Sequence, residues 1–162
     1  MSGNANHTLG IDWTAVETTP QFTLGELKQD RNGTQYQYVK ASAALTVNET
    51  YIIPYTYTIA SGNKLDQTTD DAAPVAVGVV QHSSFTTSGQ YGWIFVGPGV
   101  GSVKVLANCA ADVPVYSTAT AGALDDASAS AKLVAGLKLT AANGGSTAAV
   151  ACYATSKLHI TA

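Results

Sequence analysis

The chain has 162 residues, of which 46% are hydrophobic but only 12% are charged. A chain of this length suits one domain and can bury a core without help from a metal or a disulfide. The charged fraction is about half of the ~25% that is usual in soluble domains. Low charge with abundant Ala, Thr, Ser and Gly leads us to expect that other subunits cover much of the surface.

Charge and hydropathy argue against two classes of partner. The net charge is −3, and the densest basic pair, Lys28 and Arg31, is separated by Asp30. Nucleic-acid binding requires several grouped cations, so we expect none. No run of about 18 apolar residues could span a membrane. The first residues lack the basic and apolar regions of a signal peptide, which predicts maturation in the cytoplasm where the chain is made.

Residues 1–20 are polar apart from isolated apolar positions and predict an extended N-terminal arm before a β-rich domain at residues 21–162. Leu9, Ile11 and Trp13 alternate, which would point them to one side of an extended segment. Amphipathic aromatic side chains favour interfaces, so Trp13 would anchor the arm on a neighbouring surface. The three residues are therefore predicted contacts to another chain. The alternative is that this segment forms the first strand of the domain.

The first β-hairpin is predicted around the Asn-Gly pair at residues 32–33. Such a pair favours the positive φ angles of a tight turn. After it, residues 34–40 alternate, with Tyr36 and Tyr38 on one side of the strand. Residues 21–27 supply the partner strand.

The rest of the chain predicts further short strands separated by turns that are rich in Gly, Pro, Asn and Asp. Their expected ranges are 50–60, 75–80, 91–96, 103–106, 113–116, 133–140 and 147–155, with residues 118–130 as a connection and His159 and Ile160 in a short tail. Residues 41–47 leave a helical turn and a short buried strand open as alternatives.

Individual residues refine these expectations. Pro54 would confine its strand to an edge or a bulge, and Pro114 would lie at an edge. The apolar run at residues 91–96 would be buried on both faces, and residues 97–101, rich in Gly, would form a hairpin connection. Roughly eight short strands with little room for a helix predict an all-β fold, either a compact small β-barrel, a β-tulip or a two-sheet sandwich.

No combination of residues predicts catalysis. His7, His82 and His159 have no acidic neighbour, and no Gly-x-Ser-x-Gly motif is present. The acidic pairs at residues 70–71 and 125–126 lie among Thr, Ala and Ser, which favours solvated turns over a glycosidase pair or a calcium loop. His82, beside two serines, is the best position for a hydrolase, but we expect no enzyme activity.

The two cysteines, Cys109 and Cys152, lie in small apolar surroundings. Their wide spacing matches neither a metal-ligand pattern nor a redox motif. We expect two buried thiols, with a disulfide between them as the alternative. The sequence predicts no metal and no other cofactor.

Several segments, in this order, resemble the small head decoration (cement) proteins of tailed bacteriophages and the structural proteins encoded beside major capsid genes. They are Phe-Thr-Leu-Gly at 22–25, Tyr-Gln-Tyr-Val-Lys-Ala at 36–41, Ala-Val-Gly-Val at 76–79, Gly-Gln-Tyr-Gly-Trp-Ile-Phe-Val-Gly at 89–97, Thr-Ala-Thr-Ala-Gly at 118–122 and Leu-Asp-Asp at 124–126. None of these is a chemical motif, because all are strand and turn patterns whose order carries the resemblance.

The resemblance implies a compact β-barrel or β-tulip with an extended arm. It also implies that the chain binds the outside of the phage head as a homotrimer and stabilises the capsid lattice against the pressure of the DNA. The partners would be the major capsid protein and other copies of this chain, and the location would be the virion surface. Leu9, Ile11 and Trp13 would then contact the capsid or a neighbouring subunit. The long polar segment at residues 1–20 departs from the family pattern.

The alternative function is a tail- or fibre-associated module of a virion, or a carbohydrate-binding β-domain. Such a module needs a row of exposed aromatic side chains, and Tyr51, Tyr55 and Tyr57 alternate suitably. The same tyrosines would otherwise pack within the sheet or at a subunit interface.

Overall fold

The computed structural model describes residues 7–8, 11–68, 75–128 and 131–161. The chain is 46% strand. In the described residues the one helical element is a 3-10 turn at Ser61–Asn63. The predicted all-β fold class is confirmed. The strands are β1 (His7–Thr8), β2 (Ile11–Asp12), β3 (Val16–Glu17), β4 (Leu27–Gln29), β5 (Gln35–Ala41), β6 (Thr50–Ile52), β7 (Thr58–Ile59), β8 (Val75–Val79), β9 (Tyr91–Phe95), β10 (Gly99–Val105), β11 (Pro114–Ser117), β12 (Leu124–Asp125), β13 (Leu133–Leu139) and β14 (Ala148–Thr161).

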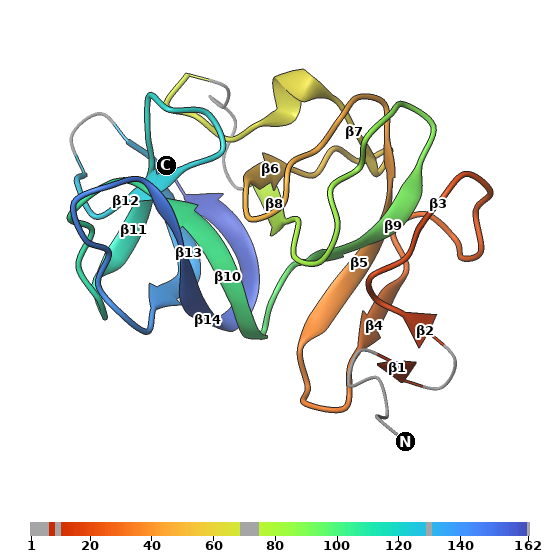
Figure 1. The fold of residues 1–162 in the computed structure, drawn as a ribbon, viewed down its shortest axis with the longest axis horizontal. Coiled ribbons are helices and arrows are strands. Elements are labelled where there is room, and N and C mark those ends of the chain that lie inside the picture. The colour runs from red at the N-terminus through yellow and green to blue at the C-terminus, as the bar shows by residue number, and fades with distance from the viewer. Residues whose placement is uncertain (1–6, 9–10, 69–74, 129–130, 162) are drawn as a thin grey trace.

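The C-terminal strands close into a five-stranded barrel, seen on the left of Figure 1. Around the ring, β10 pairs with β12, β12 with β11, β11 with β13, β13 with β14, and β14 again with β10. The last pairing is antiparallel and runs from Gly99 opposite Ala154 to Val105 opposite Ala148. Closure satisfies the backbone groups that an open sheet would leave at its edges.

The N-terminal strands form an open sheet around β5, β8 and β9, seen on the right of Figure 1. Both of its faces are buried. Tyr36 and Tyr38 on β5 join the larger hydrophobic core, whereas Val39, from the opposite face of β5, joins a second cluster. Trp93 and Ile94 on β9 divide between the two clusters in the same way. The expected alternation of β5 and the burial of both faces of residues 91–96 are confirmed.

Strand β8 joins the two regions. It pairs with β6 and β9 in the open sheet and, through Val75 and Ala76, with Ile160 and His159 on β14. The larger core is therefore continuous from the aromatic side chains of the sheet into the barrel. The expected C-terminal tail at residues 159–160 was wrong, because these residues lie near the end of a 14-residue strand.

The predicted hairpin is present, but its first strand is β4 rather than residues 21–27. In its turn only Gly33 has a positive φ, of 83°. The Asp30 carboxylate accepts hydrogen bonds from the backbone N–H groups of Asn32 and Thr34, at 2.8 and 2.9 Å. This is a three-residue loop with glycine at the left-handed position, so the Asn-Gly pair marks the turn but not its expected type.

Residues 97–101 do not form the predicted hairpin connection. Strand β9 pairs with β3, β5 and β8, whereas β10 belongs to the barrel, so the chain crosses here from one sheet to the other. Gly97 has a φ of 67°, and a Cβ atom there would lie 2.5 Å from the Ser156 carbonyl oxygen. Glycine lets the crossing pass directly against β14.

Barrel closure accounts for two further differences. Pro114 was expected at an edge, but β11 lies between β12 and β13, and Pro114 is tolerated there as the first residue of its strand. The connection expected at residues 118–130 contains β12, two residues long, which completes the ring. By contrast, Pro54 does interrupt the strand expected at residues 50–60, which divides into β6 and β7.

Candidate functional site

The described part of the predicted arm packs as part of the domain. Trp13 is 2% exposed and stacks on Tyr36, with ring centroids 4.8 Å apart, and it meets Trp93 edge-on at 5.1 Å. Ile11 is 8% exposed and joins the same core, while Leu9 lies outside the described residues. The contacts to another chain proposed for Ile11 and Trp13 therefore need correction, because these side chains already lie inside their own chain. The alternative, a first strand-forming segment, fits the structure.

The side chains of His82 and His159 contact a tyrosine hydroxyl and a backbone carbonyl group. His82 Nε2 lies 3.2 Å from the Tyr36 hydroxyl, and His159 Nδ1 lies 3.2 Å from the Lys157 carbonyl oxygen. Burial lowers the pKa of His82, although the charges of two aspartates oppose this shift. Ser84, close to His82 in sequence, accepts a hydrogen bond from the Val47 N–H at 3.1 Å. The described residues thus place His82 in a structural contact, and the absence of enzyme activity stays a prediction.

A buried carboxylate, Glu49, connects three separate segments. It precedes β6 and is 4% exposed. Its oxygens lie 2.6 Å from Lys64 Nζ and 2.9 Å from Lys104 Nζ, and the Tyr51 hydroxyl donates to it at 3.1 Å. Burial opposes ionisation, but the hydrogen bonds from the two lysines outweigh it and hold the pKa of Glu49 below its ordinary value of 4.5. No sequence pattern indicates this cluster, because Glu49, Lys64 and Lys104 are far apart in the chain.

The three tyrosines do not form the exposed ridge that a carbohydrate-binding module would need. Tyr51 is fully buried and accepts a hydrogen bond from the Thr46 N–H at 2.8 Å, whereas Tyr55 is fully exposed. Tyr57, half-buried, has a φ of 53°. The turn after Pro54 ends the strand alternation on which the prediction depended, so only Tyr55 presents its whole ring to solvent.

Tyr55 lies at a groove with a volume of about 330 Å³, which Ile53 and Val75 also line. Gln37 also lines it, and its Oε1 is a buried acceptor without a hydrogen-bond partner in the described part of the chain. The groove is largely apolar and lies between the open sheet and Lys157 of β14. Its size falls at the lower end of the range of small-molecule pockets.

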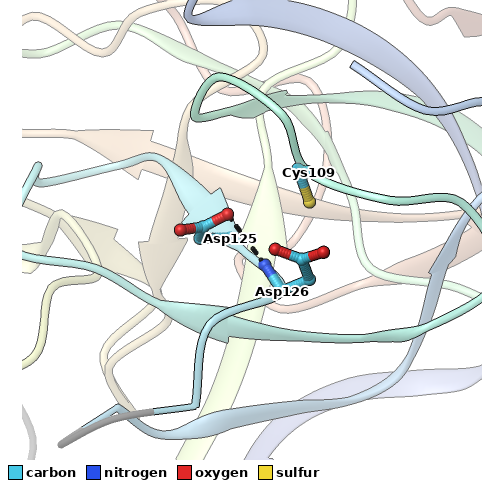
Figure 2. A group of neighbouring side chains, drawn as sticks. All are labelled: Cys109, Asp125 and Asp126. Carbon is cyan, nitrogen blue, oxygen red and sulfur yellow. Dashed lines mark hydrogen bonds between the residues drawn. The ribbon is translucent and has the colours of Figure 1, made fainter. Parts of the chain in front are cut away.

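Cys109, Asp125 and Asp126 form the group best suited to hold a metal ion among the described residues, and Figure 2 shows the thiol beside the two carboxylates. One ligand atom from each lies within 4.8 Å of the others. The Asp126 carboxylate accepts a hydrogen bond from the Ala110 N–H at 2.9 Å, and Asp125 accepts one from the Asp126 N–H at 2.9 Å. The carboxylates are half-buried, which corrects the expectation of a solvated turn. The other acidic pair, residues 70–71, lies outside the described residues.

The chemistry of this group favours a structural role, in which hydrogen bonds connect two segments, over a metal centre. Burial, followed by the charges of the two aspartates, raises the pKa of Cys109 to about 11, so the thiol is protonated at neutral pH. Burial also raises the pKa of Asp125. Asp126 ties the loop after β10 to β12 through the Ala110 N–H. Cys109 and Cys152 are both buried and free, as predicted.

Small and apolar side chains line the outer side of β14 from Ala149 to Tyr153, while Lys104 of β10 and Lys138 of β13 lie opposite Ala149 and Tyr153 on the neighbouring strands. Side chains alternate in the first half of β14, with Val150 and Cys152 facing inward and Ala151 and Tyr153 outward. Tyr153 lies directly opposite Val100 of β10, and these two side chains are 44% and 61% exposed. We call Val100, Ala149, Ala151 and Tyr153 the barrel patch.

Comparison with known proteins found no match to this chain, either among protein-family models or among curated proteins. Within the described ranges, no helix has the length and apolar character needed to cross a bilayer.

Proposed function

We propose that the chain is a non-enzymatic structural protein that decorates the outer surface of a bacteriophage capsid, as a homotrimer bound to the major capsid protein. The ordered resemblance of its strand and turn segments to head decoration proteins motivates the proposal. The single structural observation that supports it best is the barrel patch.

The barrel patch is suited to a flat protein interface. Tyr153 and Val100 are large, partly exposed side chains that lie opposite each other on paired strands, and the outward neighbours of Tyr153 are Ala151 and Thr155 on β14 and Lys138 on β13. Interface centres are depleted of charge and enriched in aromatic side chains, of which tyrosine is one. Large apolar side chains grouped on the surface of a soluble chain often mark such a contact.

A lattice of identical sites also suits a chain with little charge. Because a trimer would engage several capsid subunits at once, each contact can be weak and the assembly still stable. Contacts made by uncharged surfaces depend little on ionic strength, since salt screens charges and leaves apolar burial intact. Capsid binding is therefore expected to persist in concentrated salt.

The test combines light scattering with sedimentation. The purified chain should scatter as three times its 16.6 kDa mass and should sediment with matching capsids that lack it. The variant Tyr153→Asp, which leaves the inward face of β14 unchanged, should lose one of these properties. Leu27→Asp is the matched control, because Leu27 is 41% exposed but lies on β4, away from the barrel.

The outcomes separate the parts of the proposal. If the Tyr153→Asp variant remains a trimer but does not bind capsids, the barrel patch is the capsid contact. If the variant becomes a monomer, the barrel patch is the contact between subunits. A variant that remains trimeric and binds capsids normally would overturn the role of the barrel patch. An unmodified chain that remains monomeric and never sediments with capsids would overturn decoration itself.

A further inference from the structure

A small pocket lies where the N-terminal segment crosses the aromatic face of the open sheet, near β2, β3 and β9 in Figure 1. Its volume is about 160 Å³. Asp12 and Glu17 from β2 and β3 line one part of it, and Phe22, Tyr38 and Trp93 line another. Of the described side chains that line it, none is basic. We call it the acidic aromatic pocket.

Three rings form the aromatic wall and fix one another in place. The centroid of the Phe22 ring lies 5.3 Å from that of Tyr38 and 5.0 Å from that of Trp93, at interplanar angles of 71° and 62°. Tyr38 and Trp93 are 5.1 Å apart at 57°. Tyr38 and Trp93 are 1% and 4% exposed, so the half-buried Phe22 ring supplies most of the aromatic surface that stays accessible in the pocket. A ring face attracts a cation placed within about 6 Å of it.

The acidic wall is also fixed. The Asp12 carboxylate accepts hydrogen bonds from the N–H and the hydroxyl of Thr14, at 2.9 and 2.6 Å. Glu17 is half-buried and accepts a weak hydrogen bond from the Tyr38 hydroxyl at 3.4 Å. Among the described lysines and arginines, none forms an ion pair with Glu17.

The Tyr38 hydroxyl joins the two walls. It accepts a hydrogen bond from the Gln21 N–H at 3.1 Å while it faces Glu17. Burial, and then the charge of Glu17, raises the pKa of Tyr38, so the hydroxyl stays neutral. The pocket thus combines negative charge, a neutral hydroxyl and three aromatic rings in a space too small for a nucleotide or an oligosaccharide.

From this geometry we infer that the acidic aromatic pocket binds one alkylammonium group, the end of a lysine side chain of a partner protein. The Glu17 carboxylate complements the charge, and the aromatic wall attracts the ammonium group and packs against the methylene stem. A lysine presents a compact cation on an apolar stem, which suits a narrow pocket better than a planar guanidinium does. This site is separate from the barrel patch and does not depend on capsid decoration.

The experiment titrates the full chain with N-α-acetyl-lysine N-methylamide and follows tryptophan fluorescence, since Trp93 lines the pocket. The uncharged analogue N-α-acetyl-norleucine N-methylamide is the ligand control. We expect saturable binding of the lysine probe alone, weakened several-fold as salt rises to about 0.5 M because screening acts on the carboxylates. N-α-acetyl-arginine N-methylamide and choline complete the set of probes.

Two variants locate the binding. Glu17→Gln should weaken binding of the lysine probe at least roughly fivefold, because it removes a charge but keeps the shape. Glu26→Gln, which removes a carboxylate paired with Lys28 outside the pocket, should bind like the parent chain. Circular dichroism confirms that both variants are folded.

Each remaining outcome overturns part or all of the inference. Equal responses to the lysine and norleucine probes, or no saturable response to any cation, would overturn the site. Unchanged binding by Glu17→Gln would place the cation elsewhere. Preference for the arginine probe or for choline would overturn lysine as the source of the cation.

Discussion

The barrel and the open N-terminal sheet bury their strands in different ways. The barrel closes on itself, with side chains such as Val103, Leu139 and Val150 inside it and the outer side of β14 in solvent. The open sheet is covered on both faces, by aromatic side chains toward the larger core and by aliphatic ones toward the second cluster. Closure needs only short alternating strands, whereas a sheet covered on both faces needs loops and an N-terminal segment to cover it.

This difference separates the surfaces as well. The outer face of the barrel carries the barrel patch, with one hollow along β13 and another that Ala149 helps to line. The covering segments of the open sheet meet at angles and leave hollows, which include the acidic aromatic pocket and the groove beside Tyr55. We therefore expect assembly contacts on the barrel and recognition of individual side chains on the sheet.

The largest effect that we expect tests the packing of the N-terminal segment. Trp13→Ala removes a ring that contacts Tyr36 and Trp93, and should lower the free energy of unfolding by about 3–5 kcal/mol. In the barrel, Val103→Ala removes far less buried surface and should cost about 2 kcal/mol. Urea denaturation of both variants gives the comparison.

Leu27→Ala, at a partly exposed position on β4, is the control for Trp13→Ala and should stay near the parent stability. Equal stability of the Trp13→Ala variant and the parent chain would show that the N-terminal segment does not stabilise the domain. The proposed difference between the two regions would then be wrong.

The second effect tests the charged junction between the regions. Glu49→Gln leaves Lys104 of the barrel and Lys64 without their carboxylate, and should cost about 1–3 kcal/mol at neutral pH. Because the folded pKa of Glu49 lies below 4.5, its contribution is present above that pH and is lost as the pH falls through the folded pKa. The difference in melting temperature between the parent chain and the variant should therefore shrink as the pH is lowered from neutral to below pH 4.

Glu26→Gln is the matched control for the junction, since its partner Lys28 is two residues away and the pair is exposed to solvent. It should leave the melting temperature unchanged. A Glu49→Gln variant that melts with the parent at every pH would show that the junction adds nothing to stability.

The smallest effect distinguishes Tyr51 on β6 from Tyr55 in the turn that follows it. Tyr51→Phe deletes a buried hydroxyl that contacts Glu49 and the Thr46 N–H, and should cost about 1–2 kcal/mol. Tyr55→Phe changes a fully exposed ring and should leave stability unaltered. Chemical denaturation measures the free energy of unfolding of both variants. Equal values would contradict the difference in burial between Tyr51 and Tyr55.

Local patterns predicted some elements well. The Asn-Gly pair marked the turn between β4 and β5, and the apolar run at residues 91–96 revealed a strand buried on both faces. The site was harder to predict. The acidic aromatic pocket gathers Asp12 and Glu17 with Tyr38 and Trp93, and nothing in their spacing indicates that they meet.

The sequence by itself determined the all-β class, the turns and the alternation of side chains along each strand, because these depend on neighbouring residues and on a period of two. Only the tertiary structure decided which strands pair. The pairing of β10 with β14 closed the barrel, β9 and β10 separated into different sheets, and Trp13 became a core residue rather than an arm contact. Such choices depend on the apolar surface that distant segments bury together, and an alternating segment looks the same whether it covers its own sheet or a neighbouring chain.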